Sequence, residues 1–408
     1  MKLKIGFVGC GRFSGVFVPL FRDHPLVEKV AVCDIRRDRA DRFAKDYHIA
    51  DVYYDYEDLL KSDVNCIAVF TQRDNHAPFV LAALNAGKHV CEAAPIANSL
   101  EDIAAIVDKV AATGLTYMTM ETSYYYASTI FCRKKFRQGH MGDFVYGEAR
   151  YCHNIAHMQK SFESSGGDNW KWHAGFPPMY YPTHSTSMIL SVTGAKVKSV
   201  SCAGFADGGS DGIFTKGGNR WGNIFSNQTA LMYSDDGGSF VVNEFRRTGY
   251  TSQKNSVYLS IFGTEGVYEQ GAAGCAWMRQ ENEEYEDVTG FLNCSSKEGY
   301  NLNMADLIKT DFATIESTVH NKDRLPQSFA GHHNGHFGSH QFLVDDFAKA
   351  VAADKLPPNH VWAAAGHCAP GIVAHESSEK GGILLAVPDF GDPPRGKGVL
   401  EEDEGYEW

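Results

Sequence analysis

Over residues 1–123, short apolar runs alternate with stretches whose apolar positions recur at helical spacing. Ser99 stands three residues before Asp102, which is the arrangement of a helix N-cap. The predicted strands cover residues 3–9, 27–35, 65–72, 88–95 and 115–122, and the predicted helices cover residues 17–25, 36–49, 76–88 and 99–114. This alternation predicts a parallel sheet covered by helices, which we assign to a domain of residues 1–123.

The pattern changes after residue 123, where apolar and polar positions mostly alternate between turns, as is typical of antiparallel strands. These strands are predicted within residues 143–154, 196–206, 228–236, 238–250 and 255–270. One further helix is predicted over residues 339–354, and the polar segment 161–178 is predicted as a loop. We therefore expect an α/β protein whose second domain, residues 124–390, has an open and mostly antiparallel sheet. A polar acidic tail follows at 391–408.

The composition is that of a globular protein and narrows the partners. Of 408 residues, 43% are hydrophobic and 22% are charged, and the formal net charge is -12. This acidic balance argues against a nucleic-acid partner, which requires a clustered basic face. No apolar run is long enough for a membrane span, and the first one leads into a glycine loop rather than a signal-peptide cleavage site. The cysteines form no CxxC pair, so we expect reduced thiols, a cytoplasmic location and no metal site.

A glycine loop follows the first predicted strand and approximates the dinucleotide fingerprint G-x-G-x-x-G/A. Gly9 would permit the tight turn, and Gly11 would let the backbone approach a pyrophosphate at the N-terminus of the next helix. Asp34 ends the second strand, where a carboxylate accepts from ribose hydroxyls and repels a 2′-phosphate. NAD is the predicted cofactor, with NADP left open by Arg36 and Arg37. The predicted contacts are Gly9, Gly11, Arg12, Phe13, Ser14, Asp34 and Ile35.

Five stretches occur in an order and spacing that resemble the Gfo/Idh/MocA family of NAD(P)-dependent oxidoreductases. They read GFVGCGRFSG, CDIRRDRADRFA, AVFTQRDNHAPFVLAALNAGKHV, MGDFVYGEARY and IFGTEGVYEQ, and they run through nearly the whole chain. The resemblance implies an N-terminal Rossmann domain, substrates among sugars and cyclitols, and a C-terminal sheet through which a homo-oligomer (dimer or tetramer) forms. It also implies that Thr71, Asn75 and His76 contact the cofactor.

The chain departs from the family where a catalytic lysine is expected. After GKHV the family carries Glu-Lys-Pro, but here Ala93 and Ala94 precede Pro95. An alanine cannot transfer a proton, so the usual lysine is absent. Glu92, Ala93 and Pro95 are kept as predicted cofactor contacts, and Glu92 is not given the role of the lysine.

His184 is the predicted catalytic base. The family places its catalytic histidine here, at the start of a helix that faces the nicotinamide, and an imidazole titrates near the working pH. Many members read Asp-x-Gly-x-His, whereas this chain has Tyr180 at the position of the aspartate. The YPTH element at 181–184 and NWKWHAG at 169–175 are similar to the NAD-dependent glycosidase branch of the superfamily.

A glycosidase of that branch needs a second base, for which Tyr181 and Tyr151 are candidates. Either tyrosine would need a lowered pKa, from a cation such as Lys171 or from the cofactor itself. The alternative is that the tyrosines only bind the sugar, and Glu121 would assist the leaving group or bind hydroxyls. The residues predicted to contact the substrate are Tyr125, Trp170, Trp172 and Tyr180.

Three functions remain open on this sequence. The favoured one is hydride abstraction from a sugar carbinol, at C3, with NAD recycled while the glycosidic bond is cleaved. The second is an ordinary sugar or cyclitol dehydrogenase that releases NADH, and the third is a non-catalytic NAD-binding sensor. For the late histidine cluster GHHNGHFGSH, at 331–340, pocket lining or helix capping is favoured over metal binding, because no acidic or thiol ligand accompanies it in regular spacing.

Overall fold

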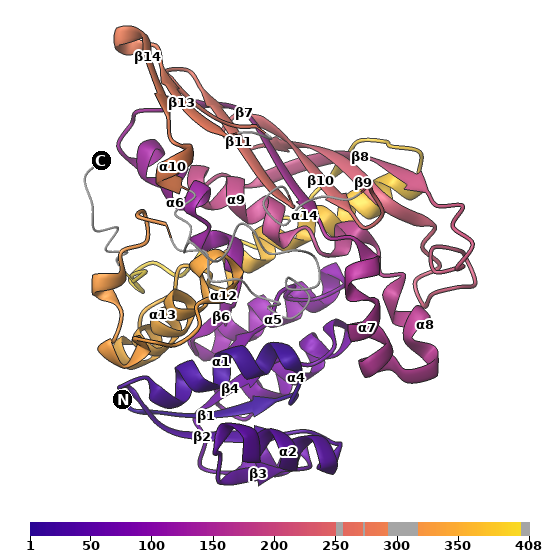
Figure 1. Cartoon of the computed structure of the whole chain (residues 1–408), viewed down its shortest axis with the longest axis vertical. Helices are drawn as coiled ribbons and strands as arrows, with labels where there is room; N and C mark the ends of the chain where they lie inside the picture. The colour runs from indigo at the N-terminus through magenta and orange to yellow at the C-terminus, as the bar shows by residue number, and fades with distance from the viewer. Residues whose placement is uncertain (250–255, 272–273, 293–316, 401–408) are drawn as a thin grey trace.

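Two sheets organise the chain. The computed structural model describes residues 1–249, 256–271, 274–292 and 317–400. A six-stranded sheet has the order β3-β2-β1-β4-β5-β6, and a nine-stranded sheet has the order β14-β13-β12-β11-β7-β10-β9-β8-β15. In Figure 1 the six-stranded sheet lies at the bottom and the nine-stranded sheet at the top, with helices between them.

Every strand pair of the six-stranded sheet is parallel, which confirms the predicted Rossmann arrangement. Its strands are β1 (Leu3–Val8), β2 (Val27–Cys33), β3 (Asp51–Tyr53), β4 (Cys66–Val69), β5 (His89–Glu92) and β6 (Tyr117–Thr119). Its helices are α1 (Arg12–Asp23), α2 (Arg37–Tyr47), α3 (Tyr56–Lys61), α4 (His76–Asn85) and α5 (Leu100–Thr113). The predicted N-cap is confirmed, because Ser99 Oγ accepts from the Asp102 amide at 3.1 Å. The sequence pattern missed β3 and α3, which are short.

The nine-stranded sheet is antiparallel except where β7 and β10 pair in parallel, as expected for the second domain. Its strands are β7 (Phe144–Cys152), β8 (Val197–Ala206), β9 (Phe225–Ser234), β10 (Ser239–Phe245), β11 (Val257–Gly263), β12 (Gly266–Gln270), β13 (Cys275–Arg279), β14 (Glu284–Asp287) and β15 (Leu385–Ala386). An oligomer through this sheet stays a prediction.

Two predictions about the helices are wrong. The predicted loop 161–178 includes the end of α7 (Ile155–Gly166) and α8 (Trp170–Ala174), and the sequence pattern missed α14 (Val361–Glu379) entirely. Helix α14 is buried around most of its surface and contains Pro370, so it lacks the amphipathic signal of a surface helix and carries a residue that usually interrupts helices. The other helices are α6 (Ala127–Arg137), α9 (Thr183–Thr193), α10 (Thr289–Leu292), α12 (Gly335–Gly338) and α13 (His340–Ala353).

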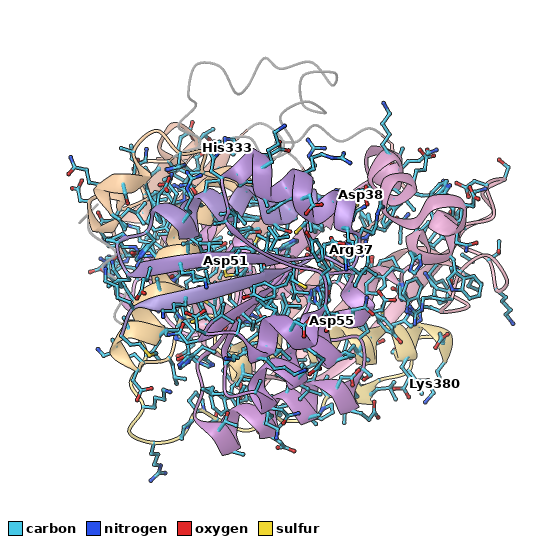
Figure 2. All side chains as sticks on the ribbon, turned by 90° about the horizontal axis from the view of Figure 1, so that it is seen from below. Arg37, Asp38, Asp51, Asp55, His333 and Lys380 are labelled. Atoms are coloured by element: carbon cyan, nitrogen blue, oxygen red, sulfur yellow. The ribbon has the colours of Figure 1, made fainter. Side chains whose placement is uncertain are left out.

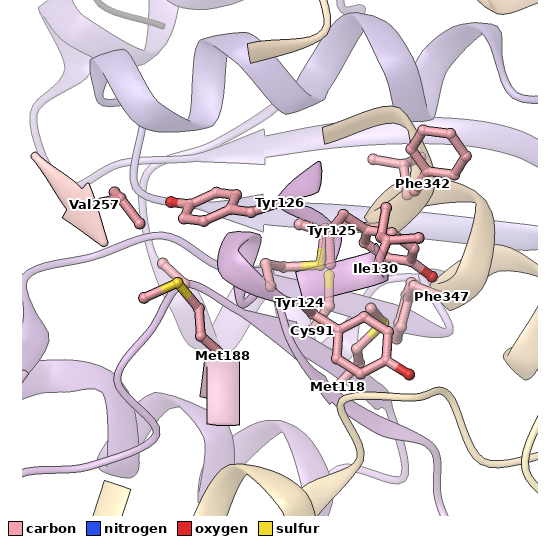
Figure 3. Packing of buried hydrophobic residues seen from close by; sticks show 14 of the residues in the cluster. Cys91, Met118, Tyr124, Tyr125, Tyr126, Ile130, Met188, Val257, Phe342 and Phe347 are labelled. Atoms are coloured by element: carbon pink, nitrogen blue, oxygen red, sulfur yellow. The ribbon is translucent and has the colours of Figure 1, made fainter. Parts of the chain in front are cut away.

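Helix α14 joins the two parts of the molecule. It contacts α5 and β6 of the N-terminal sheet on one side and β8 and α9 on the other (Figure 1). Figure 3 shows the neighbouring core, in which Tyr124, Tyr125 and Tyr126 lie among apolar residues of both parts. The domain limits at 123 and 390 therefore stay predictions, because a C-terminal helix completes the packing of the N-terminal sheet.

Two further predictions concern the chain ends and the membrane. Residues 401–408 of the predicted tail lie outside the described residues, while Val399 bridges to Leu356. Within the described ranges, no helix is both long and apolar enough to cross a membrane.

Candidate active site

The glycine loop has the geometry that a dinucleotide requires. Gly9 adopts a φ of +97°, and a Cβ there would lie 2.5 Å from the Phe70 carbonyl oxygen, so only glycine fits. A Cβ on Gly11, at the start of α1, would meet nothing within 4 Å, so the helix N-terminus is open. Ser14 Oγ accepts from the Gly11 amide at 3.2 Å and donates to the Gly9 carbonyl, which holds the loop. These residues fit a pyrophosphate at the N-terminus of α1.

Asp34 is held beside this loop at the carboxyl end of β2. Its two carboxylate oxygens accept from the amides of Cys10, at 3.0 Å, and Arg36, at 2.9 Å. A carboxylate oxygen has more than one acceptor site, so Asp34 can still accept from ribose hydroxyls. Arg37 lies over the Tyr54 ring, 4.2 Å from its centre, and is labelled in Figure 2 near the start of α2. Ile35 is 83% exposed, as suits a residue that flanks a cofactor site.

The loop after β4 and the end of β5 lie at the edge of the six-stranded sheet where its parallel strands end. His76, at the start of α4, shares its ring nitrogens with the carbonyls of Pro95, at 2.8 Å, and Thr71, at 3.4 Å. Burial lowers the pKa of His76 and raises the pKa of Glu92 well above its usual value. The Glu92 carboxyl accepts from the Tyr117 hydroxyl inside the protein. Asn75 is exposed, while Ala93 is buried, and their contacts with a cofactor stay predictions.

A buried glutamate–histidine pair lies at the end of β6. Glu121 Oε1 lies 2.5 Å from His184 Nδ1, and the same oxygen accepts from the amide and hydroxyl of Ser123, each at 2.9 Å. Burial opposes ionisation of Glu121, but the charge and hydrogen bond of His184 outweigh it and lower its pKa to about 2. Because an ionised carboxylate must accept, Nδ1 carries a proton and Nε2 of a neutral His184 is left as the proton acceptor.

His184 lies on the same side of the Rossmann sheet as the glycine loop. The parallel strands β1 and β6 end at one edge, so the loop after Val8 and Glu121 after Thr119 share it. The His336 ring packs on Phe13 of the glycine loop at 5.6 Å between centres. Burial first, and then the charge of His184, lower the pKa of His336 to about 3.

Two tyrosines enclose His184. The rings of Tyr151, on β7, and Tyr181 meet His184 edge-on at 4.8 and 5.0 Å between centres. Burial raises the pKa of Tyr181 to about 12 and that of Tyr151 well above its usual value. The lowered pKa that a tyrosine base would need is therefore not found in the protein alone, and the raised pKa values favour protonated phenols. The Tyr151 hydroxyl lies 2.8 Å from His153 Nδ1.

The cations beside these tyrosines differ from the predicted one. Lys171 lies on α8 at the side of the molecule (Figure 1), where its ammonium donates to the Asp211 carbonyl at 3.0 Å. The guanidinium of Arg73 instead lies over the Tyr181 ring at 4.6 Å, and that of Arg246 lies 5.6 Å from the Tyr151 ring centre. Arg246 also donates to Glu244 at 2.9 Å.

The sequence did not predict Glu244, Arg246 or Arg73, for different reasons. Glu244 and Arg246 alternate along and just after β10, so the predicted strand could have placed both on one face. The Glu244 carboxyl also accepts from Ser185 at 2.5 Å, and burial raises its pKa to about 7. Arg73 stands in a loop without periodicity, so no pattern singles it out.

The four residues that were predicted to contact the substrate lie in different surroundings. Tyr125 belongs to the core, where its ring stacks on Phe342 at 5.1 Å and its hydroxyl is shared by Asp346 and Arg324, so its predicted role is not supported (Figure 3). Tyr180 meets the His375 ring of α14 at 5.0 Å. Trp170 packs on a small cluster with Phe214, while Trp172 is 47% exposed.

The late histidine cluster shows no metal site. His336 Nδ1 and His340 Nε2 lie 2.7 Å apart, so the two rings bind each other. His332 Nε2 lies 2.8 Å from an Asp23 carboxylate oxygen. In the part of the chain that the structure describes, no three His, Cys, Asp or Glu side chains are placed to hold a metal ion. The nine cysteines described there are buried.

Comparison with known proteins finds similarity to a family of NAD-binding oxidoreductases. Residues 3–121 match the Gfo/Idh/MocA oxidoreductase family with its NAD-binding Rossmann fold. A glycosyl hydrolase family 109 protein of Shewanella sp. (strain W3-18-1) is 29% identical over 199 residues, which are 46% of this chain and 43% of that protein. A family 109 protein 1 of Shewanella sp. (strain MR-4) is 28% identical over 201 residues, with the same shares. The matched region thus spans less than half of these relatives.

Solved structures show the same fold over nearly the whole chain. Levoglucosan dehydrogenase in complex with NADH superposes with a TM-score of 0.72 at 15% identity, covering 95% of this chain and 100% of that one. Scyllo-inositol dehydrogenase from Lactobacillus casei, with NAD(H) and scyllo-inositol, has a TM-score of 0.66 at 17% identity, covering 95% and 99%. Residues 3–121 are thus similar to the Gfo/Idh/MocA oxidoreductase family, which is described by its NAD-binding Rossmann fold.

Proposed function

We propose that this protein oxidises a carbinol of a sugar, at C3, with His184 as the base. The observation that supports the proposal is the buried contact of 2.5 Å between Glu121 Oε1 and His184 Nδ1 at the cofactor edge of the sheet. NAD, when bound, supplies a hydride acceptor. Glu121 fixes the tautomer and orientation of the imidazole, and His184 Nε2 takes the hydroxyl proton. The family lysine is absent, since Ala94 occupies its place.

The enclosing residues would position the sugar. The phenols of Tyr151 and Tyr181 are protonated, so they can donate hydrogen bonds to its oxygens. The rings of Tyr151 and Tyr181 also flank His184 with low-dielectric walls, which strengthens the Glu121–His184 interaction. These roles support substrate binding rather than a tyrosinate base in the protein alone.

A second candidate is glycoside cleavage through a transient 3-keto sugar, because the relatives named above are family 109 glycosyl hydrolases. A ketone at C3 acidifies the proton at C2, and loss of that proton expels the aglycone. Water then adds, and the ketone is reduced again. No net NADH would form.

One experiment tests both candidate activities and the alternative that the protein is a non-catalytic NAD-binding sensor. The purified protein is incubated with aryl α- and β-glycosides in D₂O, first without and then with added NAD, while aglycone, NADH absorbance and deuterium at C2 are followed. Aglycone release with C2 deuteration and no net NADH supports the glycosidase. NADH that depends on added NAD, with the glycosidic bond intact, supports the dehydrogenase. Neither product, from any glycoside or from the free sugars and inositols, contradicts the proposal.

A further inference from the structure

Arg73 is a cation at the junction of the two parts of the molecule without an acidic partner. It begins the short helix η1 (Arg73–Asn75) after β4, and its guanidinium lies over the rings of Tyr181, at 4.6 Å, and Phe176, at 5.0 Å. Among the described residues, no carboxylate forms an ion pair with it and no hydrogen bond engages its side chain. The Arg73 guanidinium therefore lies over the Tyr181 ring without a carboxylate in ion-pair contact among the described residues, and Asp74 attracts it only from a longer distance.

The carboxylates nearby already have other partners. Asp74, the next residue in the chain, is bound by Arg220. Glu244 is bound by Arg246 at 2.9 Å and by Ser185, and Glu121 is bound by His184. Arg246 in turn repels Arg73, so the second guanidinium adds to the positive charge around Tyr181.

Arg73 is half-buried, and its loss of contact with water lowers the pKa of its guanidinium from the usual value. Stacking on rings occupies the faces of the guanidinium but leaves its N–H groups free in the plane. These groups form a fork that matches the two oxygens of a carboxylate. The missing partner is therefore expected to come from a ligand.

We propose that the substrate of this site is a sugar acid whose carboxylate is bound by Arg73, beside the hydroxyl of Tyr181. The proposal rests on the proposed function, because it names the substrate class of the same pocket. A carboxylate carries one negative charge, which matches the single charge of the Arg73 guanidinium. A phosphate brings about two charges at neutral pH, which exceeds the charge of this one guanidinium. The neutral sugar is thus the weaker ligand, and the phosphorylated sugar is disfavoured.

The cofactor offers a competing source of negative charge. Its pyrophosphate is assigned to the N-terminus of α1, where Gly11 is open. Arg73 instead follows β4 and packs against Phe176 and Tyr181, which belong to the second part of the chain. This placement favours the substrate over the cofactor as the ligand of Arg73, and the binding test below distinguishes the two ligands.

The test is a calorimetric titration of the NAD-loaded protein with D-glucuronate and D-galacturonate, each against its neutral parent, D-glucose or D-galactose. At least one acid is expected to bind about tenfold to a hundredfold more tightly than its parent. Arg73→Gln is expected to remove that preference, so that each acid binds no more tightly than its parent sugar, and Arg73→Lys is expected to keep part of it. Arg279→Gln, on the distant strand β13, is the matched control and is expected to keep the full preference.

Four results would overturn the proposal. Three concern the wild-type protein: equal affinities for each acid and its parent sugar, no measurable binding of either acid, or tighter binding of glucose 6-phosphate than of either acid. The fourth is an Arg73→Gln variant that loses NAD affinity but keeps the preference for the acid. If Arg73→Gln does not fold, the wild-type preference and Arg73→Lys still decide. NADH formation is recorded alongside: preferential binding of an acid without hydride transfer would contradict the proposed function alone, and turnover of neutral sugars without preference would contradict this inference alone.

Discussion

Two buried glutamates end neighbouring parallel strands of the same sheet, and their charges differ. Glu92 ends β5 and Glu121 follows β6, and both are 1% exposed or less. Burial raises the pKa of Glu92 well above its usual value, so it is a neutral acid. Glu121 is just as buried, yet its pKa falls to about 2 because His184 and Ser123 donate to it.

The difference shows that burial alone does not decide whether a glutamate is ionised. The side chain that contacts its carboxyl group decides it. Near Glu92 the histidine is His76, whose Nδ1 lies 3.8 Å from the carboxylate and is already engaged by the Pro95 carbonyl. The remaining partner is the Tyr117 hydroxyl, which carries no charge. Only the Glu121 pair is therefore charged and able to hold an imidazole ready for proton transfer.

The largest expected effect comes from removing the imidazole. His184→Ala is expected to lower kcat for hydride transfer by about 10²–10⁴-fold, because no other group replaces a positioned base. NADH formation at saturating NAD measures the loss, and circular dichroism with an NAD titration serves as the control for fold and cofactor binding. Wild-type turnover in this variant would rule out His184 as the base.

A smaller effect is expected from neutralising its partner. Glu121→Gln keeps the shape of the side chain but removes the charge that fixes the His184 tautomer, so kcat is expected to fall about a hundredfold with KM little changed. The matched variant is Glu92→Gln, in which an already neutral group is replaced by another. If Glu92→Gln slows turnover as much as Glu121→Gln, the contrast between the two sites is incorrect.

The last expected effect concerns stability against pH rather than turnover. A raised pKa in the folded state means that folded Glu92 keeps its proton while the unfolded chain loses it above pH 4.5, so this residue lowers the free energy of unfolding as the pH rises. The local slope is about 1.4 kcal/mol per pH unit. Glu92→Gln is expected to remove it, so thermal unfolding at pH 8 and pH 4 should show the variant gaining at pH 8 relative to wild type.

For Glu121 the sign is reversed. Its folded pKa of about 2 lies below the ordinary 4.5, so its contribution to stability is full above pH 4.5 and is lost as the pH falls toward 2. Glu121→Gln is therefore expected to be destabilised most at neutral pH, with the difference from wild type shrinking in acid. The same unfolding curves, recorded at pH 7 and pH 3, measure it. A difference that grows in acid would contradict an ionised Glu121.

Much of the Rossmann half could be predicted from sequence because each element carries a local signal. Ser99 and Gly114 mark the two ends of α5, and the apolar runs of β1, β2, β4 and β5 are short and bounded by turns. His184 was found because its position matches a family motif. The motif identified the residue but not its partner, since Glu121 lies 63 positions away and only folding brings the two together.

The remaining features of the site depended on packing between distant segments, which no local sequence pattern encodes. Tyr125 looked like a pyranose platform in a run of tyrosines, but Asp346 and Arg324 draw its hydroxyl into the core. The charge state of Tyr151 and Tyr181 required their burial to be known. Arg73 is singled out only because the carboxylates near it are bound by other residues in the described structure, which is a property of the folded chain.

The position of α14 has a consequence for how the chain is made. The helix packs on α5 and β6, yet it is translated long after them, because Val361 follows Thr119 by most of the second part. At ordinary rates of synthesis this delay is on the order of tens of seconds. During that interval the surface of α5 that α14 covers in the folded protein stays without that cover, so the N-terminal sheet completes its packing only after residue 379 has been made.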